Sequence, residues 1–454
     1  MKQYEAYKDS GIQWLGKIPS HWNVVPLKYN LSLKGRIGWN GLKSDEFKEE
    51  SFAYLVTGQD FIKADIDWSK CYQIDKERYE EDPFIQLANG DLLVTKDGTI
   101  GKVAKVSRLD KPACLNSGIF VVKKIKDAFI QDFLYWTFVS SQLIDFNNFN
   151  STGSTIQHLY QNVFENMPLL VPSITEQQAI ASYLDYKVGQ IDAAIAEKEQ
   201  MLEDLKAYRS AIISEAVTKG LDKNVEMKDS GNDIIGNIPK RWKVVKTLYC
   251  LSMPITDGPH TTPDLFEDGI PFISAEAVSC GNGKIDFSHM RGYVSQDFYD
   301  ECCKKYVPQK DDIYMIKSGA TTGKVAIVDT DRIFTIWSPL AVFRCDRSVM
   351  LPYYMFYLLQ SPIYQTQVEL GWSFGTQQNI GMRVLEKIQV PVPPVEEQIV
   401  ISDYLNNINS ETDRIMSGVK DQIDALKAYK SAIITEAVTG KVDLRDWKPK
   451  QVNA

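Results

Sequence analysis

The chain carries the same helix-like segment twice, and this repeat limits the folds open to it. The segment "LKAYRSAIISEAVT" at 205–218 returns as "LKAYKSAIITEAVT" at 426–439, with 12 of 14 positions identical and a separation of 221 residues. Solenoid repeats are only about 20–50 residues long, so this period is far too long for a solenoid. The sequence therefore predicts two copies of a much larger unit.

Three further pairs of segments repeat in the same order, which indicates duplication of a whole domain with its helix. They are "YKDSGIQWLGKIPSHWNVV" (7–25) with "MKDSGNDIIGNIPKRWKVV" (227–245), "LLVTKDGTIGKVA" (92–104) with "IYMIKSGATTGKVA" (313–326), and "VPSITEQQAIASYLD" (171–185) with "VPPVEEQIVISDYLN" (392–406).

The first part of each half, 1–172 and 220–393, mixes short β-type runs with turns. The expected strands are "FAYLVTG", "DLLVTKDG" and "GIFVVKKI" in the first half, and "IPFISAEAV", "DIYMIKSG" and "LAVFRC" in the second. Helical patterns interrupt them at 129–145 and 352–370. Each half thus predicts a mixed α/β (α+β) domain.

A long helix is expected after each domain, at 173–219 and 394–440, followed by a C-terminal tail at 441–454. Apolar residues recur with the 4-3 spacing of a coiled-coil seam: Leu184, Val188, Ile191, Ile195, Leu202, Leu205 and Ile212, then Leu405, Met416, Val419, Ile423, Leu426 and Ile433. Polar seam residues such as Lys198, Arg209 and Lys430 are expected to fix the register. Near-identical seams favour antiparallel pairing about a pseudo-two-fold axis, in a rod of about 60 Å. The alternative is two independent amphipathic helices, each packed on its own domain.

Two glycine-lysine turns, "DGTIGK" (97–102) and "GATTGK" (319–324), resemble a nucleotide-binding P-loop but lack its glycine spacing and the hydroxyl residue after the lysine. Two alternatives stay open: a tight turn between strands, or a loop that brings side chains to DNA phosphates or base edges. The candidate DNA contacts at these turns are Lys96, Thr99, Lys102, Lys317, Ser318, Thr321, Thr322 and Lys324.

Two loops at corresponding places, 34–47 and 255–269, differ in sequence although the helices are nearly identical. This contrast is expected if each half has the same shape but reads a different target; simple drift of loop sequences is the alternative. Their candidate DNA contacts are Arg36, Trp39, Asn40, Lys43, His260, Thr261 and Thr262.

The sequence shows no catalytic or metal-binding pattern. Methyltransferase and nuclease motifs are missing, the seven cysteines form no C-x-x-C pair, and the four histidines lie far apart. The chain begins "MKQYEAYKDSG", without an apolar leader, and contains no run of about 20 apolar residues, so a cytoplasmic protein without a membrane span is expected. The net charge of −8 alone disfavours nucleic-acid binding, but a local basic surface or partner subunits can supply positive charge.

Together these segments resemble the specificity (S) subunit of type I restriction–modification systems over almost the whole chain. The resemblance rests on the motifs "GKIPSHW" and "GNIPKRW", "DGTIGKVA" and "GATTGKVA", "ITEQQAIASYLD" and "VEEQIVISDYLN", the two "LKAY" helix ends, and "DGPHTTP" (257–263).

The resemblance implies a non-catalytic subunit in which each domain reads one half of a split double-stranded DNA site and the helices set the spacer. It also implies docking of two methyltransferase subunits that carry S-adenosylmethionine, and of restriction subunits that use ATP and Mg, with no cofactor on this chain. Two alternatives are a stand-alone DNA-modifying enzyme and a structural coiled-coil scaffold. The first lacks a cofactor motif, and the second has no need for divergent polar loops.

Overall fold

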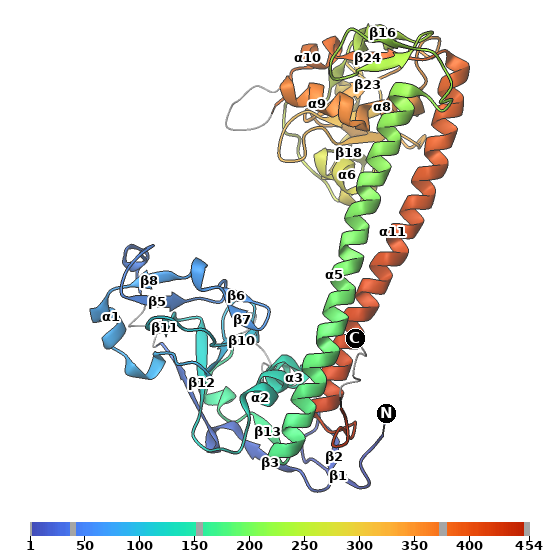
Figure 1. Cartoon of the computed structure of the whole chain (residues 1–454). Coiled ribbons are helices and arrows are strands. Elements are labelled where there is room, and N and C mark those ends of the chain that lie inside the picture. Colours follow the sequence, from blue (N-terminus) through green and yellow to red (C-terminus); the bar gives the residue numbers. More distant parts are fainter. Residues whose placement is uncertain (1, 37–41, 151–157, 372–378, 449–454) are drawn as a thin grey trace. The chain divides into compact units, whose positions relative to one another are not determined.

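The computed structural model describes residues 2–36, 42–150, 158–371 and 379–448. The chain divides into two compact units: unit 1 comprises Met1–Lys198 with Asp421–Ala454, and unit 2 comprises Glu199–Lys420. The division falls within the two long helices, α5 (Ile174–Lys219) and α11 (Val395–Val438) (Figure 1). Each unit therefore combines one expected recognition domain with part of both helices.

Unit 1 is built on a four-stranded sheet, β10-β9-β12-β4, and a three-stranded sheet, β11-β5-β8, in which β11 and β5 are parallel. Short two-stranded pairs join β1 to β2, β6 to β7 and β13 to β3. The strands are β1 Tyr7–Asp9, β2 Lys17–Pro19, β3 Asn23–Pro26, β4 Leu31–Gly35, β5 Ala53–Val56, β6 Phe61–Ile62, β7 Asp65–Ile66, β8 Tyr72–Ile74, β9 Leu92–Thr95, β10 Val103–Lys105, β11 Ala113–Leu115, β12 Ile119–Lys124 and β13 Pro168–Val171. The shorter helices are α1 Lys76–Glu80, α2 Gln131–Val139, α3 Ser141–Asn150 and α4 Gln161–Phe164.

Unit 2 repeats this topology, with sheets β17-β23-β20-β21 and β19-β18-β22 and with the pairs β14-β15 and β16-β24. The strands are β14 Met227–Asp229, β15 Asn237–Pro239, β16 Lys243–Lys246, β17 Thr256–Asp257, β18 Ile270–Ile273, β19 Gly292–Val294, β20 Ile313–Ile316, β21 Val325–Ile327, β22 Thr335–Ile336, β23 Leu340–Phe343 and β24 Gln389–Val392. The helices are α6 Ala275–Cys280, α7 Gln296–Cys303, α8 Pro352–Gln360, α9 Pro362–Leu370 and α10 Met382–Lys387. The matching strand orders confirm the duplication predicted from the sequence.

The six expected strand runs all contain a strand, namely β5, β9, β12, β18, β20 and β23. One run was assigned too long: "IPFISAEAV" forms β18 only as far as Ile273, and α6 begins at Ala275. The helical patterns each form two helices, because the chain turns at Ser140 between α2 and α3 and at Ser361 between α8 and α9, where Pro362 begins the new helix.

The two long helices pack together within each unit, as the seam predicted. The buried seam residues of unit 1 are Leu184, Val188, Ile191, Ile195, Ile423 and Ile433, and those of unit 2 are Leu405 and Val419. The half-buried seam residues are Leu202, Leu205, Ile212 and Met416 in unit 2 and Leu426 in unit 1. Independent helices are therefore excluded.

Charged pairs across the seam show that the helices are antiparallel. In unit 2 Arg209 donates to the Asp413 carboxylate, and in unit 1 Lys430 Nζ lies 2.6 Å from Asp192 Oδ1. Arg209 matches Lys430 in the repeat, and Asp192 matches Asp413, so the two pairs are equivalent. Lys198 also bonds across the seam, to Gln422. These contacts support the expected role of polar seam residues in fixing the register.

A buried glutamine explains the repeated "EQ" at the start of each long helix. In unit 2 the Gln398 side-chain amide donates to Val349 O at 2.8 Å and Pro393 O at 2.9 Å, and accepts from the Leu351 N–H at 2.7 Å. Gln177 makes the same three contacts in unit 1, with Ala128, Pro172 and Ile130. Both glutamines are fully buried. One side chain thus joins the helix start to the segment that precedes α2 or α8.

Gln398→Ala is expected to destabilise unit 2 by about 2–4 kcal/mol, because it leaves buried backbone donors and acceptors without partners. Chemical denaturation of the whole chain measures the change. Gln178→Ala, one residue further along the matching helix at an exposed position, serves as a control and should have little effect. Equal stability of Gln398→Ala and the wild type would contradict the clamp role.

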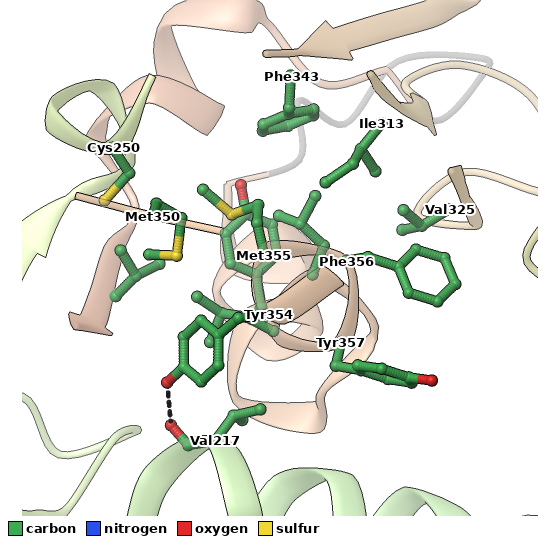
Figure 2. Packing of buried hydrophobic residues seen from close by; sticks show 14 of the residues in the cluster. Val217, Cys250, Ile313, Val325, Phe343, Met350, Tyr354, Met355, Phe356 and Tyr357 are labelled. Atoms are coloured by element: carbon green, nitrogen blue, oxygen red, sulfur yellow. Dashed lines mark hydrogen bonds between the residues drawn. The ribbon is translucent and has the colours of Figure 1, made fainter. Parts of the chain in front are cut away.

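The core of unit 2 joins its recognition domain to the helices. Helix α8 contributes Tyr354, Met355, Phe356 and Tyr357, which pack against buried residues of the sheet and of α5 (Figure 2). The Tyr354 hydroxyl donates to Val217 O of α5 at 3.1 Å. This packing fixes the sheet of unit 2, and the loops at its strand ends, relative to the helix segments of the same unit.

Candidate nucleic-acid interface

The glycine-lysine turn of unit 2 joins β20 to β21 and is closed by its own backbone. Gly319 and Gly323 have left-handed φ values of +103° and +91°, which glycine adopts without strain. The Gly323 N–H donates to Ile316 O at 2.8 Å, and the Thr322 hydroxyl donates to Gly319 O at 2.6 Å. Lys324 is exposed, and its Nζ lies 3.4 Å from Ser279 O. The turn is rigid and carries an accessible cation.

The matching turn of unit 1 joins β9 to β10 in the same way. Gly98 and Gly101 have left-handed φ values, and the Thr95 hydroxyl donates to Thr99 O at 2.5 Å and accepts from the Lys102 N–H at 2.9 Å. Thr99 and Lys102 are exposed. These segments are tight turns between strands, as the first alternative predicted, and they present lysines to solvent. The contact with DNA stays a prediction.

The loop containing "DGPHTTP" meets the glycine-lysine turn in unit 2. Asp257 Oδ2 lies 3.2 Å from Lys317 Nζ and 3.3 Å from His260 Nε2. His260, Thr261 and Thr262 are exposed, whereas Lys317 is buried against Asp257. The structure therefore brings together the two segments that the sequence selected separately in this half.

Asp257 and Lys305 belong to this site but were not among the predicted contacts. Asp257 is only 1% exposed and accepts a hydrogen bond from Lys305. Burial raises the pKa of the Asp257 carboxyl, but the Lys305 hydrogen bond and the charge of Lys317 outweigh it, so the pKa lies below its ordinary value. Asp257 belongs to the motif "DGPHTTP", which the sequence selected as a candidate loop. Lys305 is distant in sequence, and no local pattern around it indicated this site.

Arg36 does not lie on the surface of unit 1. Its side chain is buried, its Nε donates to Leu115 O at 3.0 Å, and Nη2 lies 3.5 Å from Cys114 Sγ. The prediction of a direct DNA contact by Arg36 is therefore corrected, because this guanidinium faces the protein interior. Trp39 and Asn40 lie outside the described residues, and Lys43 is exposed.

Lys96, the counterpart of Lys317, has a different environment. Its Nζ lies 4.9 Å from the centre of the Phe120 ring, a cation–π contact, and Gly35 leaves room for the same ring. A third segment then borders each turn: the Leu159 N–H donates to Lys96 O at 3.1 Å, and the Ile380 N–H donates to Lys317 O at 2.8 Å. Ser318 pairs with Asn379 in the same place. Three separate segments thus meet at the turn of each unit.

The described part of the chain shows no group of three or more His, Cys, Asp or Glu side chains placed to hold a metal ion. None of its helices has the length and apolar character needed to cross a membrane. Five of the seven cysteines are buried as free thiols, and burial raises the pKa of Cys71 and of Cys250 to about 12. The candidate site is formed by the polar loops at the strand ends, where separate segments meet the glycine-lysine turns.

Comparison with known proteins assigns this arrangement to a family. The family described as "Type I restriction modification DNA specificity domain" matches residues 42–204 and again residues 263–425. The chain belongs to this family. The two matched ranges each cover most of one recognition domain and part of the helix that follows it, in agreement with the duplication.

Members of the type I specificity family resemble this chain over most of its length. The EcoBI specificity subunit of Escherichia coli is 25% identical over 364 residues, covering 79% of this chain and 74% of that protein. The MjaVIII specificity subunit of Methanocaldococcus jannaschii is 23% identical, covering 95% of each. A solved chain from a study of complex assembly and conformational transition of the type I R-M system has a TM-score of 0.68 at 16% identity, covering 94% of this chain and 99% of that chain. This likeness shows the fold.

Proposed function

We propose that this chain is the DNA-reading subunit of a type I restriction–modification complex, with each unit reading one half of a bipartite double-stranded DNA site. The observation that carries the proposal is the repeated site: in both units a glycine-lysine turn is joined by a backbone hydrogen bond to a distant segment, at Leu159 in unit 1 and at Ile380 in unit 2, on a duplicated scaffold with different loops. Membership of the specificity family supports the same role. A stand-alone DNA-modifying enzyme and a structural scaffold are not favoured.

The paired helices are proposed to set the spacer between the two half-sites and to dock two methyltransferase subunits. The pseudo-equivalent pairs Arg209–Asp413 and Lys430–Asp192 support this, because an antiparallel helix pair presents the same surface twice to two copies of one partner. S-adenosylmethionine chemistry is assigned to those partners, and ATP- and Mg-dependent cleavage to restriction subunits, in the cytoplasm. This chain would contribute DNA recognition alone.

The proposal is tested by DNA binding with and without a co-expressed methyltransferase subunit. Gel shifts should show specific binding to a bipartite site, identified by sequencing the methylated bases of the host genome, and the partner should strengthen it. The negative net charge of this chain makes that help expected, since phosphate affinity depends on positive charge supplied to the DNA. Failure of the complex to select any sequence would refute DNA reading.

Lys324→Ala should weaken binding of the complex to specific and non-specific DNA alike. Because Lys324 is exposed at the end of a rigid turn, it can reach a phosphate, and losing one phosphate contact reduces the slope of log affinity against log salt by about 0.9. Titrations at several salt concentrations measure this slope. Lys310→Ala, an exposed lysine at the opposite end of β20, is the control. An unchanged slope for Lys324→Ala would remove Lys324 from the interface.

Thr321→Ala tests base reading at the same turn. Thr321 is half-buried and its hydroxyl is a candidate for a base edge, so its loss should reduce discrimination between correct and altered half-sites more than it reduces overall affinity.

A further inference from the structure

The carboxylate of Asp257 lies beside three basic side chains that come from three separate segments of unit 2. His260 belongs to the loop that follows β17, Lys305 follows α7, and Lys317 stands at the end of β20. The side chains of His260 and Lys305 are 74% and 50% exposed, whereas that of Lys317 is 11% exposed. A buried anion therefore anchors side chains that extend to the surface.

The backbone next to Asp257 is also fixed. A Cβ atom on Gly258 would lie 2.1 Å from Ile336 O, so only glycine allows this close approach. The Ser338 N–H then donates to Pro259 O at 3.2 Å. The loop is thus attached to the sheet on both sides of Gly258, and the exposed residues His260, Thr261 and Thr262 follow directly.

The Asp257 carboxylate also lies beside the imidazole of His260. Because Nε2 faces Asp257 at 3.3 Å, Nδ1 is the ring nitrogen left for another partner. A histidine held in this way can exchange a hydrogen bond with a base edge through Nδ1, and Thr261 and Thr262 can supply hydroxyls beside it.

Unit 1 lacks this arrangement. In the strand pairing, Gly35 stands opposite Phe120 as Asp257 stands opposite Ala341, so Gly35 occupies the matching position. The counterpart of Lys317, Lys96, lies over the Phe120 ring. The two units therefore hold the lysine that begins the turn by different chemistry, a carboxylate in unit 2 and an aromatic ring in unit 1.

We propose that Asp257 is a positioning residue for half-site reading by unit 2, holding loop 257–263 and turn 317–324 together so that both meet the DNA as one surface. The inference rests on the proposed function and deepens it. Asp257 acts through His260, Lys305 and Lys317, and the base edges are contacted by the exposed side chains of the two segments.

The test compares Asp257→Asn with Asp312→Asn in the complex with the methyltransferase subunit. Asp312 is a matched control: it is also 1% exposed and ion-paired, with Arg344 Nε at 2.7 Å, but it stands at the other end of β20 and accepts hydrogen bonds from Gln309 and Tyr306, not from either of the two segments. Both variants lose a buried carboxylate, so the thermal unfolding temperature should fall for both. Only Asp257→Asn should reduce discrimination against substitutions in the unit 2 half-site, by about tenfold or more, with the unit 1 half-site read as before.

The readouts are the methylated motif in cells and gel shifts with each half-site randomised in turn. Equal discrimination by Asp257→Asn and the wild type would overturn the positioning role, and so would an equal loss in Asp312→Asn, because the loss would then follow stability. If Asp257→Asn does not fold, Lys317→Gln removes one partner and carries the same expectation of a defect confined to one half-site. A wild-type complex that reads no bipartite site would instead refute the proposed function itself.

Discussion

Exchanging residues 1–170 for the equivalent region of another family member is expected to change one half of the methylated DNA motif and leave the other half intact. Each unit carries its own sheets, turn and loops, and the chain clusters into two units with separate cores. A recognition domain moved as a block therefore takes its reading surface with it. Sequencing of methylated bases in cells that carry the hybrid and the methyltransferase subunit gives the motif directly.

The C-terminal segment has to be included in the design of this exchange. Residues 441–448 belong to unit 1: the Asp443 N–H donates to Lys2 O at 2.9 Å, and Trp447 packs on Tyr183 with ring centres 5.4 Å apart. A hybrid should thus be made with the native tail and with the donor's tail. The reciprocal exchange of 220–393 is the control and should change only the other half. A change in both halves from one exchange would contradict independent reading.

Lengthening both long helices by four residues is expected to lengthen the spacer while both half-site sequences stay fixed. Four residues add about 6 Å of helix, close to two base-pair steps of about 3.4 Å. The insertions belong after Glu197 in α5 and after Gln422 in α11, because Lys198 bonds to Gln422 across the seam and marks the point where the helices are opposite each other. Each of the pairs Arg209–Asp413 and Lys430–Asp192 then stays intact, because both of its residues lie on the same side of the inserted residues.

A four-residue insertion locally unwinds a coiled coil without removing its seam, so paired packing should survive. It also rotates the helix by about 40° beyond one turn, so methylation is expected to fall in rate while remaining detectable. The matched control inserts four residues in α5 alone, which shifts the two charged pairs out of register and should destabilise the chain. An active double insertion that methylates the original spacer would rule out the helices as the ruler.

The sequence alone determined the duplication, the long helices and the family. Similar segments repeated in the same order are sufficient to predict the duplication, since two copies of one segment order fold to one topology. The heptad-like spacing is sufficient to predict the long helices, because it places Leu184, Val188 and Ile191 on one face of a helix independently of the rest of the fold. Local pattern also located six of the strands, although α6 replaces the expected end of the run "IPFISAEAV".

Only the tertiary structure decided which polar residues stand at the surface and which stand inside. Arg36 and Lys305 are both basic residues near loops, yet Arg36 is buried on the Leu115 carbonyl and Lys305 bonds to Asp257 from a distance of 48 positions. Such pairings depend on which strand ends meet, and no local pattern encodes that. The assembly of each unit from both long helices, with the tail completing unit 1, likewise follows from antiparallel packing, which joins residues far apart in the chain.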